Sequence, residues 1–506
     1  MTKQANVYRV STSLIGKRLD AEFYQPKYVQ NEARLTKLPF PISPLGTLIR
    51  DGRRTLYMGT DTLEREQAPE SWVGFITSDD LSEDGFFVDC ATRRWVHPEF
   101  ATKYSSGKLR ANELLVKVKG PNQLAAFVGE IPSRTTLVSG TIWGALFKKT
   151  SKHDPQYVVA VLMSHYGQLA RTRMTSNTNV EFVSPTELLG LGIPSPNEDA
   201  QAYIGNKVRQ AETLRARAKE AERQFTETIS EEISRPDKRA KFSRVTAGML
   251  VGDLNPGRFD PDRLEVRNRL LANGGRPPSD FARIITNNVD DYPRSQRYLG
   301  LDGISSSSID ITFETAAEAD ANGTSRKLLE GAVLSKLRPY LNKVGYISSE
   351  GAGAIGSTEL LCVQSDEVHG GYIYGVLKLE TTTRQLNPIS TGATLPRIGS
   401  ADVLDVIVPW SDDHAVWGQR LAGAQFSYTS AKRLTIAARL LVEALIEQKV
   451  TEAELIATHK DPERDRELLA RLTTKGLDVV DAPPLFPDLD ALFELLSASD
   501  EGEADA

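Results

Sequence analysis

The feature that most constrains the fold of this chain is a long-period internal repeat, because a duplicated sequence must build one architecture twice. Residues 72–81 read as a strand that runs into a turn, and residues 298–304 repeat that pattern. Residues 114–121, with their basic Leu-Leu-Val-Lys-Val-Lys-Gly-Pro sequence, are paralleled by residues 333–339. The matches predict two copies of one mixed helix and strand domain.

Two further matches extend the repeat in both directions. Residues 18–26 recur as residues 258–264, and each segment is expected to open a short amphipathic helix. In that helix, Asp20 and Pro26 are interpreted as boundary residues. Over some 40 residues the offset between the copies settles at 215, a register that chance similarity rarely keeps. At this offset Tyr157, Val161 and Leu162 fall on Tyr372, Val376 and Leu377, residues 176–179 fall on 391–394, and Ile193-Pro194 falls on Val408-Pro409.

Each copy ends in a segment with helical periodicity and no internal proline, over residues 198–233 and 413–448. One or two apolar residues in every seven, with charges elsewhere, favour a seam between two paired helices over the core face of a buried helix. Two unrelated surface helices are the alternative. The residues predicted to form the seam are Ile204, Val208, Ala211, Ala218, Phe225, Trp417, Leu421, Ala424, Tyr428, Ala431, Ala438 and Leu445.

The repeat predicts an α+β protein with two domains related by a pseudo-twofold axis. Two long antiparallel helices, paired as a coiled coil, would separate the domains. The expected division is residues 1–196 for the N-terminal helix and first domain, 197–235 for the first long helix, 236–257 for a linker, 258–411 for the short helix and second domain, 412–450 for the second long helix, and 451–506 for a C-terminal extension.

Charge is distributed unevenly along the chain. The formal net charge is -6, but residues 476–506 hold nine acidic residues and no lysine or arginine, so residues 1–475 carry -6 + 9 = +3. A mildly basic body suits a nucleic-acid partner if its cations gather on one face. The last ten residues, SASDEGEADA, are expected to be disordered.

Other classes of protein are disfavoured by the composition. The N-terminus lacks the apolar run of a signal peptide, and no stretch approaches the roughly 18 apolar residues of a membrane span, which predicts a cytoplasmic protein without membrane contact. Cys90 and Cys362 stand alone, and the histidines are scattered. Neither a disulfide framework nor a metal site is predicted.

On these residues the chain resembles the specificity subunits of type I restriction-modification systems. The resemblance covers almost the whole chain and depends on the order and duplication of three features: the strand-turn at residues 75–81, the turn at residues 391–396, and the passage from Val406-Ile-Val-Pro409 into a long helix. The first turn, Ser176-Asn-Thr-Asn179, departs from the pattern because it lacks a glycine. No role for the C-terminal extension follows from the resemblance.

The resemblance implies what such a chain does. Each domain would be a target-recognition domain that reads one half of a split site in double-stranded DNA. Two methyltransferase subunits would dock on the long helices, with or without restriction subunits outside them. The chain itself would be non-catalytic and hold no cofactor, since S-adenosylmethionine and ATP would belong to the partner subunits.

Two fragments resemble methyltransferase motifs and are interpreted as structural. Residues 154–157, Asp-Pro-Gln-Tyr, approximate an acidic Pro-Pro-Tyr signature but are expected to start a helix. Residues 351–356 fit G-x-G-x-x-G, yet a cofactor-binding turn must join a strand to a helix, and a strand-like run follows Gly356. No other catalytic motif is present, so no catalytic residue is predicted.

Candidate DNA contacts are basic side chains for phosphates and basic or amide side chains for base edges. Positions supported by both copies are favoured, namely Lys117 or Lys119 with Lys336 or Arg338, and the two turns. The predicted contacts of the first domain are Arg53, Arg54, Arg93, Arg94, Lys117, Lys119, Arg171, Arg173, Asn177, Thr178 and Asn179. Those of the second domain are Arg294, Arg297, Lys336, Arg338, Tyr340, Arg384, Thr391, Thr394 and Arg397.

Two other functions remain open at this point. One is a tandem DNA-binding module of the same architecture that serves another defence assembly, and the other is a coiled-coil scaffold that does not read DNA. Neither the DNA bases recognised nor the length of the DNA spacer between the two half-sites follows from the sequence, because recognition of bases depends on the shapes of loops.

Overall fold

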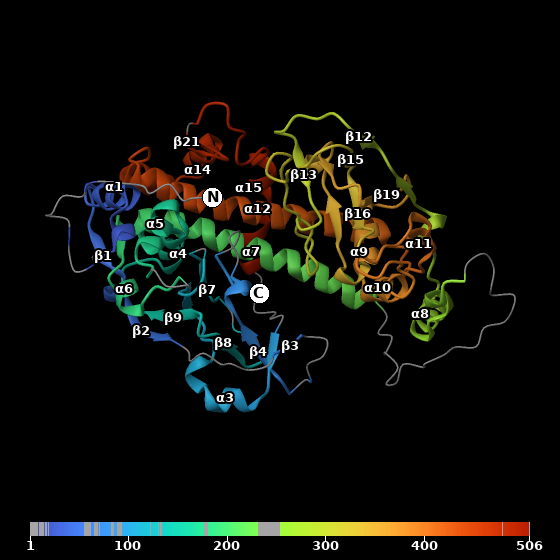
Figure 1. The fold of residues 1–506 in the computed structure, drawn as a ribbon. Helices are drawn as coiled ribbons and strands as arrows, with labels where there is room; N and C mark the ends of the chain where they lie inside the picture. Colours follow the sequence, from blue (N-terminus) through green and yellow to red (C-terminus); the bar gives the residue numbers. More distant parts are fainter. Residues whose placement is uncertain are drawn as a thin grey trace. The chain divides into compact units, whose positions relative to one another are not determined.

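The computed structural model describes residues 9, 15, 18, 20–54, 62–64, 69, 71–81, 86–88, 94–121, 123–129, 131, 134–176, 181–230, 254–477 and 479–504. The chain divides into two compact units, which we call unit 1 (residues 1–213 and 430–506) and unit 2 (residues 214–429). The division falls within two long helices, α7 (Glu198–Ile229) and α12 (His414–Ile446), labelled in Figure 1. Residues 231–235 of the predicted first long helix and residues 236–253 of the predicted linker lie outside the described residues.

Unit 1 is built around a four-stranded antiparallel sheet with the order β2-β9-β6-β7. Its central strand β6 is buried at four consecutive positions, which is typical of a strand covered on both faces. A second sheet has the order β3-β5-β4-β8, and in it β4 and β8 run parallel. The strands of unit 1 are β1 (Ile42–Pro44), β2 (Ile49–Arg54), β3 (Leu63–Glu64), β4 (Val73–Ile76), β5 (Arg94–Val96), β6 (Glu113–Lys117), β7 (Ala125–Phe127), β8 (Thr136–Val138), β9 (Ile142–Phe147) and β10 (Gly192–Pro194).

Several helices of unit 1 begin at residues whose side chains cap them, among them Asp154, Ser164 and Ser184. The Asp154 carboxylate accepts hydrogen bonds from the backbone N–H groups of Gln156 and Tyr157, and Pro155 occupies the first helical position. The Asp-Pro-Gln-Tyr fragment is therefore the start of a helix, as predicted. The helices are η2 (Ala21–Tyr24), α1 (Pro26–Leu35), α2 (Leu45–Leu48), η4 (Ser78–Asp80), α3 (Glu99–Lys103), η5 (Ser105–Gly107), α4 (Pro155–Met163), α5 (His165–Arg173) and α6 (Pro185–Leu189).

Unit 2 repeats this plan. Its first sheet has the order β11-β19-β16-β17, and its second, β12-β15-β18-β13-β14, again contains one parallel pair, β13 with β18. The strands are β11 (Arg283–Ile285), β12 (Asn288–Val289), β13 (Arg297–Leu299), β14 (Glu314–Thr315), β15 (Ser325–Lys327), β16 (Gly331–Ser335), β17 (Val344–Ile347), β18 (Ile355–Gly356) and β19 (Leu360–Gln364). The helices are η7 (Pro256–Phe259), α8 (Pro261–Ala272), η8 (Pro278–Asp280), η9 (Pro339–Leu341), η10 (Ser349–Gly351), α9 (Gly370–Lys378), α10 (Glu380–Leu386) and α11 (Ser400–Asp405).

Single hydrogen bonds show how closely the two copies correspond. The buried Tyr157 hydroxyl donates to the Pro194 carbonyl at 3.1 Å, and the buried Tyr372 hydroxyl donates to the Pro409 carbonyl at 3.0 Å. These residue pairs are related by the predicted offset of 215. The duplication is therefore present in the tertiary contacts as well as in the sequence.

The same correspondence holds for an ion pair. Arg18 bonds Glu187 at 3.0 Å, while Arg258 bonds Asp402 at 2.7 Å. Arg18 thus joins the segment before α1 to helix α6, and Arg258 joins the segment before α8 to helix α11.

The long helices pair within unit 2. The rings of Phe225 and Trp417 meet edge to face at 5.7 Å, and the Arg215 guanidinium lies 6.0 Å from the Tyr428 ring centre. Phe225 follows Arg215 in α7, whereas its partner Trp417 precedes Tyr428 in α12. The two helices are therefore antiparallel here, as predicted. All the residues of the predicted seam are buried except Trp417 and Tyr428, which are partly buried.

The C-terminal extension is folded as part of unit 1. It consists of α13 (Glu452–His459), α14 (Pro462–Arg471), β20 (Leu472–Thr473), β21 (Gly476–Leu477) and α15 (Leu489–Ala504). Helix α15 reaches Ala504, where a disordered end was expected. The buried Leu492 and Leu496, one helical turn apart, supply the apolar anchor that composition alone did not reveal.

Among the described helices, none combines the length and the apolar character that crossing a membrane requires.

Candidate nucleic-acid interface

In unit 2, two predicted basic segments meet beyond the end of strand β16. Leu337 and Thr391 both form bridges with Arg397, and the backbone N–H and C=O groups of Thr391 and Arg397 are bonded to each other at 2.8 Å in both directions. The backbone N–H of Arg338 donates to the Pro396 carbonyl at 2.7 Å. We call residues 336–342 and 391–397 together the unit 2 basic surface.

The side chains of this surface are exposed to different degrees. Lys336 and Arg397 share the Glu359 carboxylate, at 3.9 Å and 3.1 Å respectively. Thr391 and Thr394 are exposed on the turn, and Tyr340 is 49% exposed. Cations, hydroxyls and an aromatic ring in one place are the groups with which proteins contact nucleic acids.

Unit 1 has the same backbone arrangement. Lys119 and Ser176 both form bridges with Phe182, and the backbone N–H of Gly120 donates to the Glu181 carbonyl at 2.9 Å. The exposed Lys119 therefore lies beside the first turn. Three predicted contacts on that turn, Asn177, Thr178 and Asn179, lie outside the described residues.

The hydrogen bonds correct the register in which the basic residues of the copies were paired. The Val118 N–H donates to the Thr141 carbonyl and the Lys336 N–H to the Glu359 carbonyl, an offset of 218 on both sides. Lys336 thus corresponds to the buried Val118, and neither Lys117 nor Lys119 has Lys336 or Arg338 as its counterpart. Because side chains alternate along an extended chain, a shift of one residue changes the face on which a charge lies.

Arg171 was wrongly predicted to contact DNA. Its side chain is fully buried and donates to the carbonyl groups of Gln123, Leu124 and Leu162. Burial lowers the pKa of Arg171 to about 9. This guanidinium binds backbone groups inside unit 1.

Three other predicted arginines are committed to ion pairs within the fold. Arg53 bonds the fully buried Glu113 at 2.7 Å, Arg173 bonds Glu32 at 2.7 Å, and Arg384 bonds Asp262 at 2.6 Å. The side chains of these arginines are at most 14% exposed. Their geometry favours a structural role over contact with DNA, because Arg–carboxylate pairs of this kind fix the positions of the elements that they join.

The remaining predicted arginines lie in or beside the second sheets. Arg94 on β5 pairs with Asp79 at 3.3 Å, Arg294 lies 3.5 Å from Asp320, and Arg297 on β13 lies over the Phe313 ring. These three side chains are 42–52% exposed. Of the other two predictions, Arg93 lies outside the described residues, and the side chain of Arg54 does too.

Sequence reasoning missed Asn342, which closes the loop that begins at Arg338. Its side-chain amide donates to the Lys378 carbonyl at 2.8 Å, and its own backbone is left-handed with φ +49°. The Lys378 ammonium donates in turn to the Asn342 and Val344 carbonyls, both at 3.1 Å. The signal available in the sequence was an asparagine three residues after a proline, which is common at turns.

The glycine-rich fragment has the surroundings that were predicted for it. Residues 351–356 run from the 3-10 turn η10 into strand β18, and β19 follows. No helix starts at Gly356, so its backbone lacks the strand-to-helix geometry that holds a cofactor phosphate.

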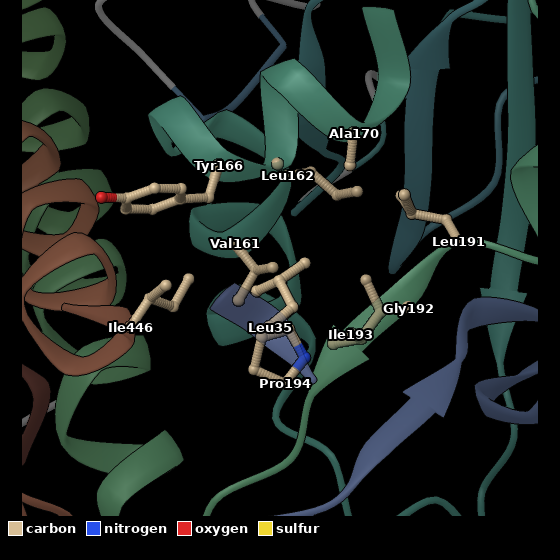
Figure 2. Close-up of a pocket in the computed structure, with 11 residues that line it drawn as sticks. Leu35, Val161, Leu162, Tyr166, Ala170, Leu191, Gly192, Ile193, Pro194 and Ile446 are labelled. Atoms are coloured by element: carbon tan, nitrogen blue, oxygen red, sulfur yellow. The ribbon is translucent and has the colours of Figure 1, made fainter. Parts of the chain in front are cut away.

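A small apolar pocket in unit 1 is a poor candidate for a binding site. Figure 2 shows its lining of aliphatic side chains, among them Leu35, Val161 and Ile446. The Tyr166 hydroxyl points toward α12 in this view and donates to Glu447 at 2.6 Å. Because ligand sites need several polar groups that converge on the ligand, this pocket is interpreted as a gap in the packing.

Comparison with known proteins gives matches among solved structures. No protein-family model and no curated protein matches the sequence. The S subunit of a type I restriction-modification system from M. genitalium is 12% identical over 85% of this chain and 95% of that one, with a TM-score of 0.31. The HsdS subunit from Thermoanaerobacter tengcongensis is 13% identical over 85% and 97%, with a TM-score of 0.25.

A third match comes from a structure that describes complex assembly and conformational transition of the type I restriction-modification system. It is 12% identical over 84% of this chain and 98% of the other, with a TM-score of 0.26. These three solved structures are described as parts of type I restriction-modification systems, and each similarity extends over most of both chains.

Proposed function

We propose that this chain is the non-catalytic DNA-recognition subunit of a type I restriction-modification complex. One observation carries the proposal: the first sheets of units 1 and 2 have corresponding strand orders, and in each unit the segment beyond strand β6 or β16 forms the same backbone bridges with the segment after the later helices. Two copies of one backbone arrangement with different side chains suit a site in two parts, with one half-site for each unit. The resemblance in sequence supplies the class of complex.

The proposal assigns separate tasks to the rest of the chain. Two methyltransferase subunits dock on the paired helices α7 and α12, and restriction subunits join outside them. S-adenosylmethionine and ATP bind to those partners, in the cytoplasm. In the alternative function, a tandem DNA-binding module of another defence assembly, the chain would contact DNA through the same surfaces and would differ only in its partner proteins.

Two measurements test the proposal. In isothermal calorimetry, the purified chain is expected to show no heat of binding with S-adenosylmethionine, because its glycine turn leads into a strand. Reconstituted with a type I methyltransferase subunit, it is expected to select a bipartite site from random duplexes. Stoichiometric binding of the cofactor by the isolated chain would contradict the non-catalytic assignment.

Controls separate the alternatives. Copurification with a methyltransferase distinguishes the restriction-modification subunit from a module of another assembly. A gel-shift assay with random duplexes distinguishes both from a scaffold, which would leave the DNA unshifted at any salt concentration.

A further inference from the structure

The loop between strands β16 and β17 is held between two residues with left-handed backbones. Arg338 has φ +51° and immediately precedes Pro339, and Asn342 has φ +49°. Left-handed backbone is unfavourable for a side chain as large as that of arginine, whereas glycine adopts it freely. Such conformations persist where the surrounding structure holds them in place, and they cluster at functional sites.

At the position that corresponds to Arg338, unit 1 has a glycine, Gly120. Gly120 has φ +94° and precedes Pro121, and its N–H bonds the Glu181 carbonyl as the Arg338 N–H bonds the Pro396 carbonyl. A Cβ at Gly120 would meet nothing closer than the flexible Lys117 side chain, at 3.6 Å. Space therefore does not require glycine there. At this position the two copies therefore differ in side chain and in backbone angle.

A difference between copies bears on specificity. Groups that hold DNA phosphates carry no sequence information, so both copies can share them. Groups that read bases must differ between the copies if the two half-sites differ. Arg338 in place of glycine is such a difference, and it lies within the backbone arrangement that the two units share.

Arg338 differs from the neighbouring cations in its ion-pair partners. Lys336 and Arg397 share Glu359, but Arg338 has no ion-pair partner in the described part of the chain, and its solvent-shielded Nε has no hydrogen-bond acceptor there. Tyr340 and Leu341 are 49% and 37% exposed. A guanidinium without an ion-pair partner is suited to donate to the edge of a guanine, and apolar side chains are suited to contact a thymine methyl group.

Hydrogen bonds hold the far end of the loop, which favours recognition because less flexibility is lost on binding. Asn342 and Lys378 bond each other through two hydrogen bonds, and Lys378 reaches the Ser305 carbonyl at 2.7 Å as well. The far end of the loop is thereby fastened to helix α9 and to the segment around Ser305.

We propose that residues 338–342 form a base-reading loop in which the Arg338 guanidinium donates to O6 and N7 of a guanine in the major groove. Tyr340 and Leu341 lie against the apolar edges of neighbouring bases, such as a thymine methyl group. The inference rests on the proposed function, since it names the chemistry by which unit 2 reads its half-site.

The test uses the full chain reconstituted with a methyltransferase subunit and a library of random duplexes. Arg338→Gly is expected to raise the melting temperature by about 2 °C, because glycine relieves the backbone strain. The same variant is expected to reduce discrimination for guanine at one position of one half-site by about tenfold or more, and to leave the other half-site unchanged. Higher stability with weaker readout is a combination that a structural role for Arg338 does not produce.

Two further variants complete the test. Arg338→Lys keeps the charge but not the forked geometry, so it is expected to weaken the guanine preference while keeping the salt dependence of binding. Gly120→Ala, the matched control, is expected to lower the melting temperature without changing either half-site. If Arg338→Gly weakens binding equally for all sequences and flattens its salt dependence, the residue contacts phosphate and the base-reading proposal fails while the proposed function stands. If the wild-type complex selects no site, the proposed function itself fails.

Discussion

Replacing Asp465 by alanine is expected to lower the free energy of unfolding of unit 1 by about 3–5 kcal/mol, the cost of leaving a buried charge without its partner. The Lys207 ammonium on α7 lies 2.6 Å from the Asp465 carboxylate on α14, and its side chain is only 2% exposed. The Tyr203 hydroxyl donates to the second oxygen of the same carboxylate at 2.8 Å. Burial lowers the pKa of Lys207, and the Asp465 carboxylate opposes that shift.

Chemical denaturation of the single variants checks this expectation. Glu467→Ala is the control, since it removes an exposed carboxylate two residues further along the same helix and is expected to change stability by less than about 0.5 kcal/mol. The double variant Lys207→Met with Asp465→Leu is expected to recover most of the loss, because a buried ion pair can be replaced by apolar side chains of similar size. Equal stability of Asp465→Ala and Glu467→Ala would show that the ion pair contributes nothing.

This contact gives the C-terminal extension a structural role that the resemblance did not supply. Truncation after residue 450 would remove Asp465 and leave the Lys207 ammonium without its carboxylate partner. A second ion pair, Lys460 with Asp199 at 2.7 Å, joins the same parts of the chain. The extension is thus part of unit 1, and its removal is expected to lower the stability of that unit.

The repeat made much of the fold predictable from the sequence. Tyr157 and Tyr372 were paired by their spacing alone, and both hydroxyls bond the carbonyl of a proline 37 residues later. The seam residues were predictable for a similar reason. A heptad pattern reports which face of a helix is buried, and Phe225 does meet Trp417.

The candidate site was less predictable, because a basic residue looks the same in sequence whether it faces solvent or the core. Arg171 satisfies three backbone carbonyls inside unit 1, and nothing local to it distinguishes it from an exposed arginine. The sequence likewise did not show which residue of unit 1 corresponds to Lys336. The offset between the copies is 215 along the later helices but 218 along the central strand, and only backbone hydrogen bonds show where it changes.

Deleting residues 212–218 together with residues 425–431 is expected to shorten the preferred spacer between the half-sites by about three base pairs. If the paired helices set the distance between the two readers, seven residues remove about 10 Å from each helix at 1.5 Å per residue, and a base pair adds about 3.4 Å. The deleted segments face each other, because the Arg215 guanidinium lies over the Tyr428 ring. Removing a whole heptad from each helix also keeps the seam on the same face.

The control is a deletion of one residue from α7 alone. It rotates the rest of the helix by about 100°, which moves Phe225 away from Trp417 and turns charged residues into the seam. That variant is expected to lose stability or assembly without acquiring a new spacer. Selection of sites from random DNA by the reconstituted complexes measures both outcomes. The 32 residues of α7 extend about 48 Å, so a double-heptad variant that still folds and binds but keeps its original spacer would show that the helices serve only as docking surfaces for the partner subunits.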